Sequence, residues 1–224
     1  MIKESKQIRK KLSLIIFVII FGIIYLQVFS YLENRIVSIN IIHTELDEMI
    51  PFCKYFIIPY LFWFAYVGVT MIYFLLYCEK EKEQYSMLYS FCAGIFVFIL
   101  ISWLYPNGHI LRPELIGDDF WTNLVRMLHS TDTPTNILPS LHVFETVVCS
   151  IALLRQNIFL RSSVHKIFII LVTVSIILST MFLKQHSIID VVFALFLNSF
   201  CYWLFYRSRP MCQENVNFRA SSIL

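Results

Sequence analysis

The sequence predicts an all-α fold, a bundle of six transmembrane helices in a single integral membrane domain that covers residues 1–224. Of the 224 residues, 58% are hydrophobic and only 15% are charged, whereas soluble domains average about 45–50% apolar and about 25% charged. The mean hydropathy is +0.70. In addition, six apolar runs are long enough, or nearly long enough, to cross a hydrocarbon layer about 30 Å thick as helices.

The six predicted spans follow one another along almost the whole chain. They lie near Leu12–Phe29, Tyr55–Tyr77, Met87–Leu104, Leu141–Leu154, Val164–Leu183 and Ile188–Tyr206. The fourth is the shortest, and it needs the preceding Pro139-Ser140 turn to reach the interface. The first has a basic start and a Val28-Phe29-Ser30 ending, so a signal peptide is its alternative interpretation. Its apolar run of about 17 residues exceeds the usual 7–15, which favours a retained span.

The distribution of basic residues predicts the orientation, because cytoplasmic segments are enriched in Lys and Arg. With both termini in the cytoplasm, the outer segments carry only Arg35, Lys54, Arg112, Arg126 and Lys184. The inner segments then carry thirteen basic residues: Lys3, Lys6, Arg9, Lys10, Lys11, Lys80, Lys82, Arg155, Arg161, Lys166, Arg207, Arg209 and Arg219. We therefore expect an integral protein of the cell membrane.

Charge and cysteine content argue against a nucleic-acid-binding protein and against a protein held together by disulfides or zinc. The net charge of +3 is small and scattered, which argues against a nucleic-acid partner. The six cysteines are far apart, without a C-x-x-C pair, and most lie in or beside apolar runs. They indicate neither a disulfide framework nor a zinc site.

Two outer segments carry the polar residues that are candidates for catalysis or phosphate binding. The segment from Tyr105 to Leu138 is 34 residues long, and its apolar content predicts packing on the membrane surface. It ends in Asn136-Ile137-Leu138-Pro139-Ser140-Leu141-His142, a pattern typical of a helix start, with His142 in the first turn. Such a helix N-terminus suits a phosphate.

The second segment brings His186 and Asp190 to i, i+4 spacing, on one face of a helix. A carboxylate inside an apolar span is costly unless it is paired, so Asp190 is a functional hypothesis. Asp190 would hold one ring nitrogen of His186 and leave the other free to attack or to accept a proton. The alternative is a structural Asp–His contact between two helices.

The predicted topology places all the candidate residues on the outer side: Arg112, Ser140, His142, Lys184, His186 and Asp190. Two histidines, one Asp and two cations near a helix N-terminus favour a phosphate-ester site. A hydrolytic metal site would need more carboxylates or a third His nearby, so we expect neither a metal nor another cofactor.

These residues resemble the three signature motifs of the type 2 phosphatidic acid phosphatase superfamily. The matching positions are Arg112-Pro113, Pro139-Ser140-Leu141-His142 and Ser179…His186…Asp190, within a catalytic motif region at 105–206. As written in this chain, the second and third motifs most resemble those of the superfamily branch near inositol phosphorylceramide synthases and sphingomyelin synthases.

The resemblance implies a metal-independent, six-helix membrane enzyme that acts on lipid phosphates at the outer face. By motif position, His186 would be the nucleophile that forms a phosphohistidine, and Asp190 would orient it. His142 would protonate the leaving oxygen, while Arg112 and Ser140 would hold the phosphoryl oxygens.

The chain departs from the family pattern at two cation positions. Tyr105 replaces the Lys seven residues before the Arg, and Thr180 replaces the Arg after Ser179. Lys184 and Arg126 are the available replacements. The missing cations weaken the case for phosphomonoester hydrolysis and leave head-group transfer open.

Other polar residues have competing interpretations. Glu145, three residues after His142, is either a partner of that histidine or a packed membrane carboxylic acid. Asp118, Asp119 and Asp132 suggest a cation site less strongly than a solvated loop or a helix cap. The remaining histidines have no partner at useful spacing and are interpreted as bystanders: His43, His109, His129 and His165.

The sequence thus predicts a membrane lipid phosphatase acting on a lipid phosphate or diphosphate. The alternatives are a phosphotransferase that moves a phospho-head group between lipids and a non-enzymatic lipid-binding or transport protein. The expected partners are a lipid phosphate substrate and membrane lipids. The identity of the lipid and the oligomeric state stay open.

Overall fold

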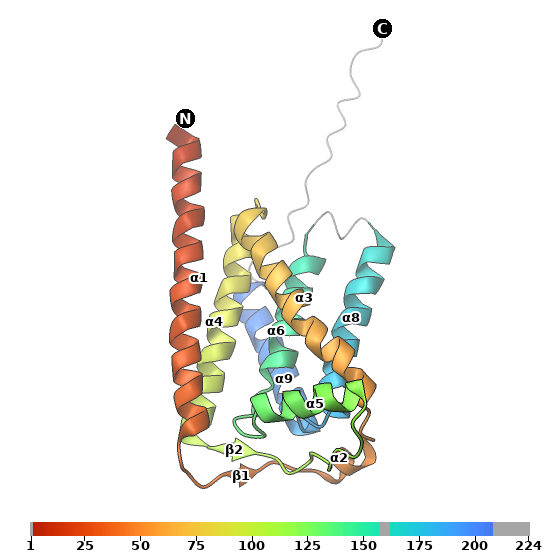
Figure 1. Ribbon diagram of the computed structural model, residues 1–224. Helices are drawn as coiled ribbons and strands as arrows, with labels where there is room; N and C mark the ends of the chain where they lie inside the picture. Colours follow the sequence, from red (N-terminus) through yellow and green to blue (C-terminus); the bar gives the residue numbers. More distant parts are fainter. Residues whose placement is uncertain (1, 157–161, 208–224) are drawn as a thin grey trace.

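A computed structural model describes residues 2–156 and 162–207, and the fold is all-α, as predicted. Six helices run side by side along one direction (Figure 1). Their bounds are α1 Ile2–Asn34, α3 Ile57–Leu76, α4 Glu81–Leu104, α6 Leu141–Leu154, α8 Ser163–Phe182 and α9 Ile188–Phe205. Each overlaps a predicted apolar run, although α1 extends beyond its run at both ends and α4 begins at Glu81 rather than near Met87. The basic residues Arg161, Arg209 and Arg219 lie outside the described residues.

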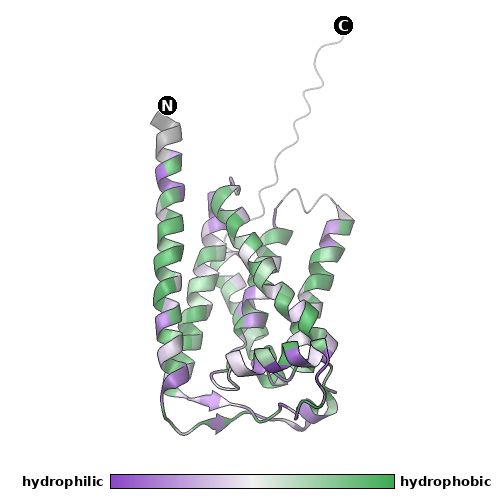
Figure 2. Ribbon diagram, in the orientation of Figure 1, coloured by the Kyte–Doolittle hydropathy of each residue, from purple (hydrophilic) through white to green (hydrophobic). Residues whose placement is uncertain are grey.

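Within the described residues, five of these helices are long and apolar enough to cross a membrane, namely all but α6. Helix α6 has 14 residues and is apolar but shorter. The long helices are mostly hydrophobic along their length (Figure 2). Helix α6 lies at the centre, in contact with α3, α4, α8 and α9, whereas α1 contacts α3 and α4 at the edge.

Close packing of α4 against α6 depends on a glycine. A Cβ added to Gly94 would lie 2.0 Å from the ring of Phe144, which is fully buried. Only a residue without a side chain lets the ring fill this space. Phe144 belongs to the main apolar core, which also contains buried residues of α3, α8 and α9.

The connections at one end of the bundle contain the other elements of the described residues (Figure 1). These are β1 Asn40–Ile41, α2 Glu45–Met49, the 3₁₀ helix η1 Lys54–Phe56, β2 Asn107–Gly108 and α5 Phe120–Thr131. Helix α5 lies across the bundle end in Figure 1, within the segment 105–138 for which the sequence predicts packing on the membrane surface. Asp119 is its N-cap, accepting hydrogen bonds from the backbone N–H groups of Trp121 and Thr122, as the helix-cap interpretation predicted.

A short backbone pairing ties three connections together. Strands β1 and β2 pair in parallel, with Asn40 opposite Asn107 and Ile41 opposite Gly108. Gly108 also bridges to Thr135, and a Cβ at Gly108 would lie 2.6 Å from the Pro134 carbonyl oxygen. The glycine therefore lets the loop that precedes α6 approach β2 closely.

Candidate active site

A cavity of about 170 Å³ lies at the end of the bundle that carries these connections. Side chains of α1, α3, α4, α6 and the loops before α6 and α9 form its wall. The lining residues are Tyr25, Phe29, Trp63, Phe98, Asp132, Thr133, Thr135, Asn136, Ile137, Leu141, His142, Glu145, Gln185 and His186.

The two candidate histidines meet in this cavity. Nε2 of His186 is 3.4 Å from Nδ1 of His142, although 44 positions separate the two residues in the chain. His142 is in the first turn of α6, and His186 is in the loop between α8 and α9. The ring of Trp63 packs against His142 at a centroid distance of 4.4 Å. The structure thus brings together the two histidines that the sequence placed on the same side.

Asp190 faces the other ring nitrogen of His186. Its Oδ2 atom is 3.5 Å from Nδ1 of His186, a longer separation than in an ordinary hydrogen bond. The same oxygen accepts a hydrogen bond of 2.8 Å from the backbone N–H of Ser187. Asp190 is completely buried and belongs to the capping box of α9. It therefore fixes the start of α9 and lies beside Nδ1 of the His186 imidazole.

Ser140 caps α6, as predicted, but does not line the cavity. Its hydroxyl accepts from the backbone N–H of Val143, and the residue is completely buried. The preceding loop is held by Asn107, whose Oδ1 atom accepts from the backbone N–H groups of Ile137 and Leu138 at 2.9 and 3.0 Å. Ser140 thus fixes the start of the helix whose first turn carries His142. Because Ser140 is not among the lining residues, the structure does not place it where the sequence predicts a contact with a phosphoryl oxygen.

Arg112 reaches the site through another residue. It donates to Oε1 of Gln185 at 2.5 Å and to the backbone carbonyl of His129 at 3.0 Å. Gln185 lines the cavity, but Arg112 does not. The guanidinium group of Arg112 therefore contacts Gln185, and Gln185 rather than Arg112 lines the cavity.

Lys184 is turned away from the cavity, in contrast to its predicted role as a phosphate-binding cation. Its Nζ atom donates to the backbone carbonyl of Asp47 at 2.5 Å, and the side chain is buried. Lys184 also has a positive φ of 56°, which turns the chain sharply before His186. Burial lowers the pKa of its ammonium group. The other proposed replacement, Arg126, bonds to Asn123 and Gly117 in the surface segment.

Neither Tyr105 nor Thr180 supplies a polar group to the cavity. Tyr105 is exposed at the end of α4. Thr180 is completely buried, and its hydroxyl donates to the backbone carbonyl of Ile177. Among the described residues that line the cavity, none is Lys or Arg.

Sequence reasoning missed Asp47, which lies in α2, outside the region of resemblance. Its carboxylate accepts from the backbone N–H of Ile188 at 2.8 Å and from the Ser187 hydroxyl at 2.7 Å. It also accepts from the backbone N–H and the hydroxyl of Thr44. Burial raises the pKa of Asp47, but these hydrogen bonds outweigh burial, so its pKa is lowered. A capping-box pattern at Thr44 was the only sequence signal, and it does not indicate the contact with α9.

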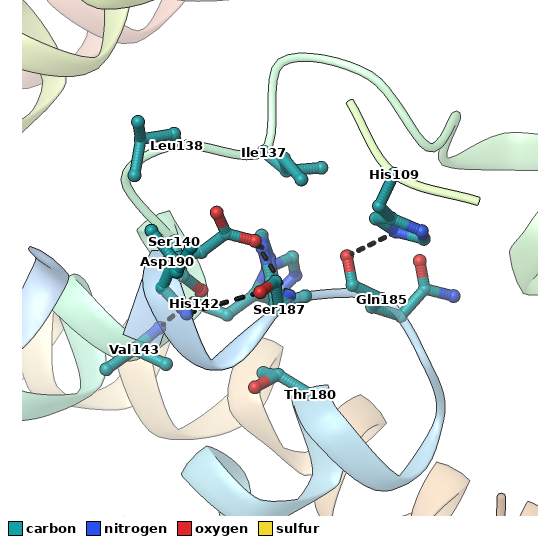
Figure 3. A network of polar contacts seen from close by, with 12 residues as sticks. His109, Ile137, Leu138, Ser140, His142, Val143, Thr180, Gln185, Ser187 and Asp190 are labelled. Carbon is teal, nitrogen blue, oxygen red and sulfur yellow. Dashed lines mark hydrogen bonds and ion pairs between the residues drawn. The ribbon is translucent and has the colours of Figure 1, made fainter. Parts of the chain in front are cut away.

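The interpretation of His109 and His129 as bystanders is wrong, because both contact the loop that carries His186. Nε2 of His109 is 2.9 Å from the Gln185 carbonyl oxygen (Figure 3), and Nε2 of His129 is 3.4 Å from that of Leu183. Nδ1 of His109 accepts from the backbone N–H of Leu111, so the proton resides on Nε2. Burial, with the nearby His186 and Arg112, lowers the pKa of His109 to about 4. At pH 7 His109 is therefore neutral, and its hydrogen bond to the Gln185 carbonyl holds the loop that carries His186.

Two carboxyl groups face the cavity. Glu145 lies one turn below His142 on α6, and Asp132 precedes the loop that leads to α6. Asp132 accepts a hydrogen bond of 3.1 Å from the hydroxyl of Tyr60. A further acid near the site, Glu33 of α1, accepts hydrogen bonds from Thr133, Thr135 and Asn136. In the described part of the chain, no group of three or more His, Cys, Asp or Glu residues is arranged to hold a metal ion.

Comparisons with known proteins give no relative: no family profile, curated protein or solved structure matches this chain.

Proposed function

We propose that this chain is an integral membrane enzyme that cleaves or transfers a phosphate ester of a lipid through a covalent bond to His186. The observation that carries this proposal is the meeting of His142 and His186 on one cavity, with Asp190 behind His186. A binding protein needs no imidazole oriented by a carboxylate. The resemblance to the type 2 phosphatidic acid phosphatase motifs supports the same reaction.

The proposed setting is a membrane crossed by six helices, with the short α6 completing its span through the preceding loop. Both termini would lie in the cytoplasm, and the cavity would open at the outer face of the cell membrane. The concentration of basic residues at the cytoplasmic end supports this orientation. The amphipathic α5 would lie at the outer interface, beside the entrance for lipid.

In the proposed mechanism, Asp190 keeps the imidazole proton on Nδ1, so that Nε2 of His186 carries the free electron pair. Nε2 attacks phosphorus, and a P–N bond forms while the P–O bond to the lipid alcohol breaks. His142, which begins the reaction as an imidazolium, gives a proton to the departing oxygen and becomes neutral. Water or a second alcohol then gives its proton to His142 and attacks phosphorus, and the P–N bond breaks. Because the facing nitrogens are 3.4 Å apart, a phosphoryl group between them requires the rings to separate.

Transfer of a phosphodiester is the second candidate, and the composition of the cavity wall favours it. A phosphomonoester dianion needs more positive charge than a phosphodiester, which carries one negative charge. The described lining contains no Lys or Arg, so a phosphodiester substrate would leave less charge unbalanced.

The test is turnover by the purified protein on a panel of labelled lipids. The panel contains phosphatidic acid, phosphatidylglycerol phosphate, an isoprenyl diphosphate and phosphodiester lipids, each with and without diacylglycerol or ceramide as acceptor. We expect free phosphate or a new phospholipid, and activity that survives EDTA because the reacting groups are side chains. Failure to convert any lipid would contradict the proposal, and loss of activity with EDTA that one divalent ion restores would contradict the metal-independent mechanism.

The proposed orientation predicts the labelling of single cysteines by an impermeant thiol reagent on intact cells. Asn107 and Gly108 are buried, so the outer position is better tested at Glu114, which is exposed in the segment before α5. Glu79, which is exposed between α3 and α4, tests the inner end. In a background without the native cysteines, we expect Glu114→Cys to react from outside and Glu79→Cys only after permeabilisation. The reverse pattern would place the cavity in the cytoplasm.

A further inference from the structure

Building on the proposed function, we propose that Glu33, in the last turn of α1, is a positioning residue that holds the cavity wall at residues 133–136. This part of the wall precedes α6, whose first turn carries His142. Helix α1 is then a functional part of the enzyme, although it lies at the edge of the bundle and outside the region 105–206 that resembles the phosphatase motifs.

The carboxylate of Glu33 binds three donors of this loop. Its Oε2 atom accepts a hydrogen bond from the hydroxyl of Thr133. Its Oε1 atom accepts from the hydroxyl of Thr135 at 3.2 Å and from Nδ2 of Asn136 at 2.7 Å. All three donors belong to residues that line the cavity. Because hydrogen bonds to a charged acceptor are stronger than those between neutral groups, this carboxylate restricts the side chains of the wall.

The backbone of the same loop is held from a second element. Asn136 is buried and has a positive φ of 52°, a conformation that few residues other than glycine adopt. Its backbone N–H donates to the carbonyl oxygen of Asn107 in β2 at 2.7 Å. Asn107 thus fixes the backbone of the loop, whereas Glu33 fixes side chains of the loop that line the cavity.

Helix α1 also contributes to the cavity directly. Tyr25, Phe29 and Glu33 follow one another at intervals of four residues, so they lie on one face of the helix. Tyr25 and Phe29 line the cavity, and Phe29 contacts Phe98 of α4 with ring centroids 6.1 Å apart. Removal of the chain up to Ser30, the signal-peptide alternative, would take both rings out of the wall. The inference therefore requires that α1 is retained in the active enzyme.

Arg35 offers a matched comparison for Glu33. It lies two residues further along the chain and donates to the backbone carbonyls of Ser102 and Trp103, at the end of α4. Neither bond reaches residues 133–136, and Arg35 does not line the cavity. Arg35 thus anchors the end of α1 to α4. If Glu33 served only as such an anchor, loss of either side chain would have the same effect.

The test compares Glu33→Ala, Glu33→Gln and Arg35→Gln in the intact chain, by hydrogen–deuterium exchange and by lipid turnover. The backbone N–H groups of Asn136 and Ile137 are hydrogen-bonded, so exchange in the peptide 132–138 reports opening of the loop. In Glu33→Ala we expect this exchange to be about tenfold faster or more, and kcat to fall about tenfold or more with a smaller change in KM. Glu33→Gln keeps one acceptor oxygen and should be intermediate.

The comparison variants make the result specific. Arg35→Gln should leave exchange at 132–138 and kcat near their wild-type values. Thr133→Val combined with Thr135→Val removes two of the three donors and should also speed this exchange, which keeps the proposal testable if Glu33→Ala does not fold. Wild-type exchange at 132–138 in Glu33→Ala, or equal effects of Glu33→Ala and Arg35→Gln, would overturn the proposal.

Failure of this inference is distinguishable from failure of the proposed function, because exchange is measured without a substrate. Faster exchange in Glu33→Ala, in a protein that converts no lipid, would retain the contact between Glu33 and the cavity wall and overturn the reaction. Normal lipid turnover by Glu33→Ala would retain the reaction and overturn the positioning role.

Discussion

Replacing His186 with alanine is expected to abolish turnover, with a loss in kcat on the order of 10⁴-fold or more. In the proposed mechanism this imidazole forms the P–N bond through Nε2, the atom that faces Nδ1 of His142 at 3.4 Å. Brief reaction of the wild-type enzyme with lipid labelled at phosphorus, followed by denaturing electrophoresis, should show an acid-labile labelled protein. The variant should show none. Unimpaired labelling of His186→Ala would remove this residue as the nucleophile.

Two other histidines serve as controls. His142→Ala retains the nucleophile but lacks the proton donor, so we expect slow labelling and a loss in kcat of about 10²–10⁴-fold. His43 lies beside Glu48 at the surface, outside the cavity lining. His43→Gln should therefore label and turn over like the wild type.

Replacing Asp47 with alanine is expected to lower both stability and kcat strongly, although Asp47 does not line the cavity. The change leaves the backbone N–H of Ile188 and the buried hydroxyl of Ser187 without their acceptor. Loss of a charged, buried acceptor shared by several donors costs about 3 kcal/mol or more. Because Ser187 is next to His186, we also expect kcat to fall about tenfold or more, with little change in KM.

The measurement combines thermal unfolding in detergent with kinetics on the best lipid of the panel. Asp119→Ala is the matched control, because Asp119 is also an acidic helix cap but lies at the surface, where it caps α5 and pairs with Lys54 of η1. It should cost about 1 kcal/mol and leave kcat unchanged. Asp47→Asn keeps one acceptor oxygen and should be intermediate. If Asp47→Ala folds stably with normal kcat, Asp47 does not position His186.

Some of the fold and of the site could be predicted from local sequence. Apolar runs predicted where the six helices lie, because a helix with an apolar surface must bury it in a core or in lipid. Asn136-x-x-Pro139-Ser140 predicted the start of α6, since a capping hydroxyl and a proline act within one turn of chain. The i, i+4 spacing of His186 and Asp190 predicted their proximity but placed both on one helix face, whereas His186 lies in the loop before α9 and only Asp190 lies in the helix.

The direction of the cationic side chains could not be predicted in this way. Lys184 is two residues from His186, yet it donates to the carbonyl of Asp47, 137 positions away. Arg112 is engaged by Gln185 and His129. A long side chain turns toward whichever acceptor the folded chain places nearby, and sequence spacing carries no information on that acceptor.

By itself, then, the sequence determined an all-α chain with its polar candidates at one end, because hydrophobic periodicity, caps and i, i+4 contacts are local. Only the tertiary structure decided that His142 meets His186, that Asp47 caps α9, and that Glu145 faces a cavity walled by aromatic rings. Each of these contacts joins segments far apart in the chain. They form because helix packing around α6 and the pairing of β1 with β2 bring those segments to the same end of the bundle.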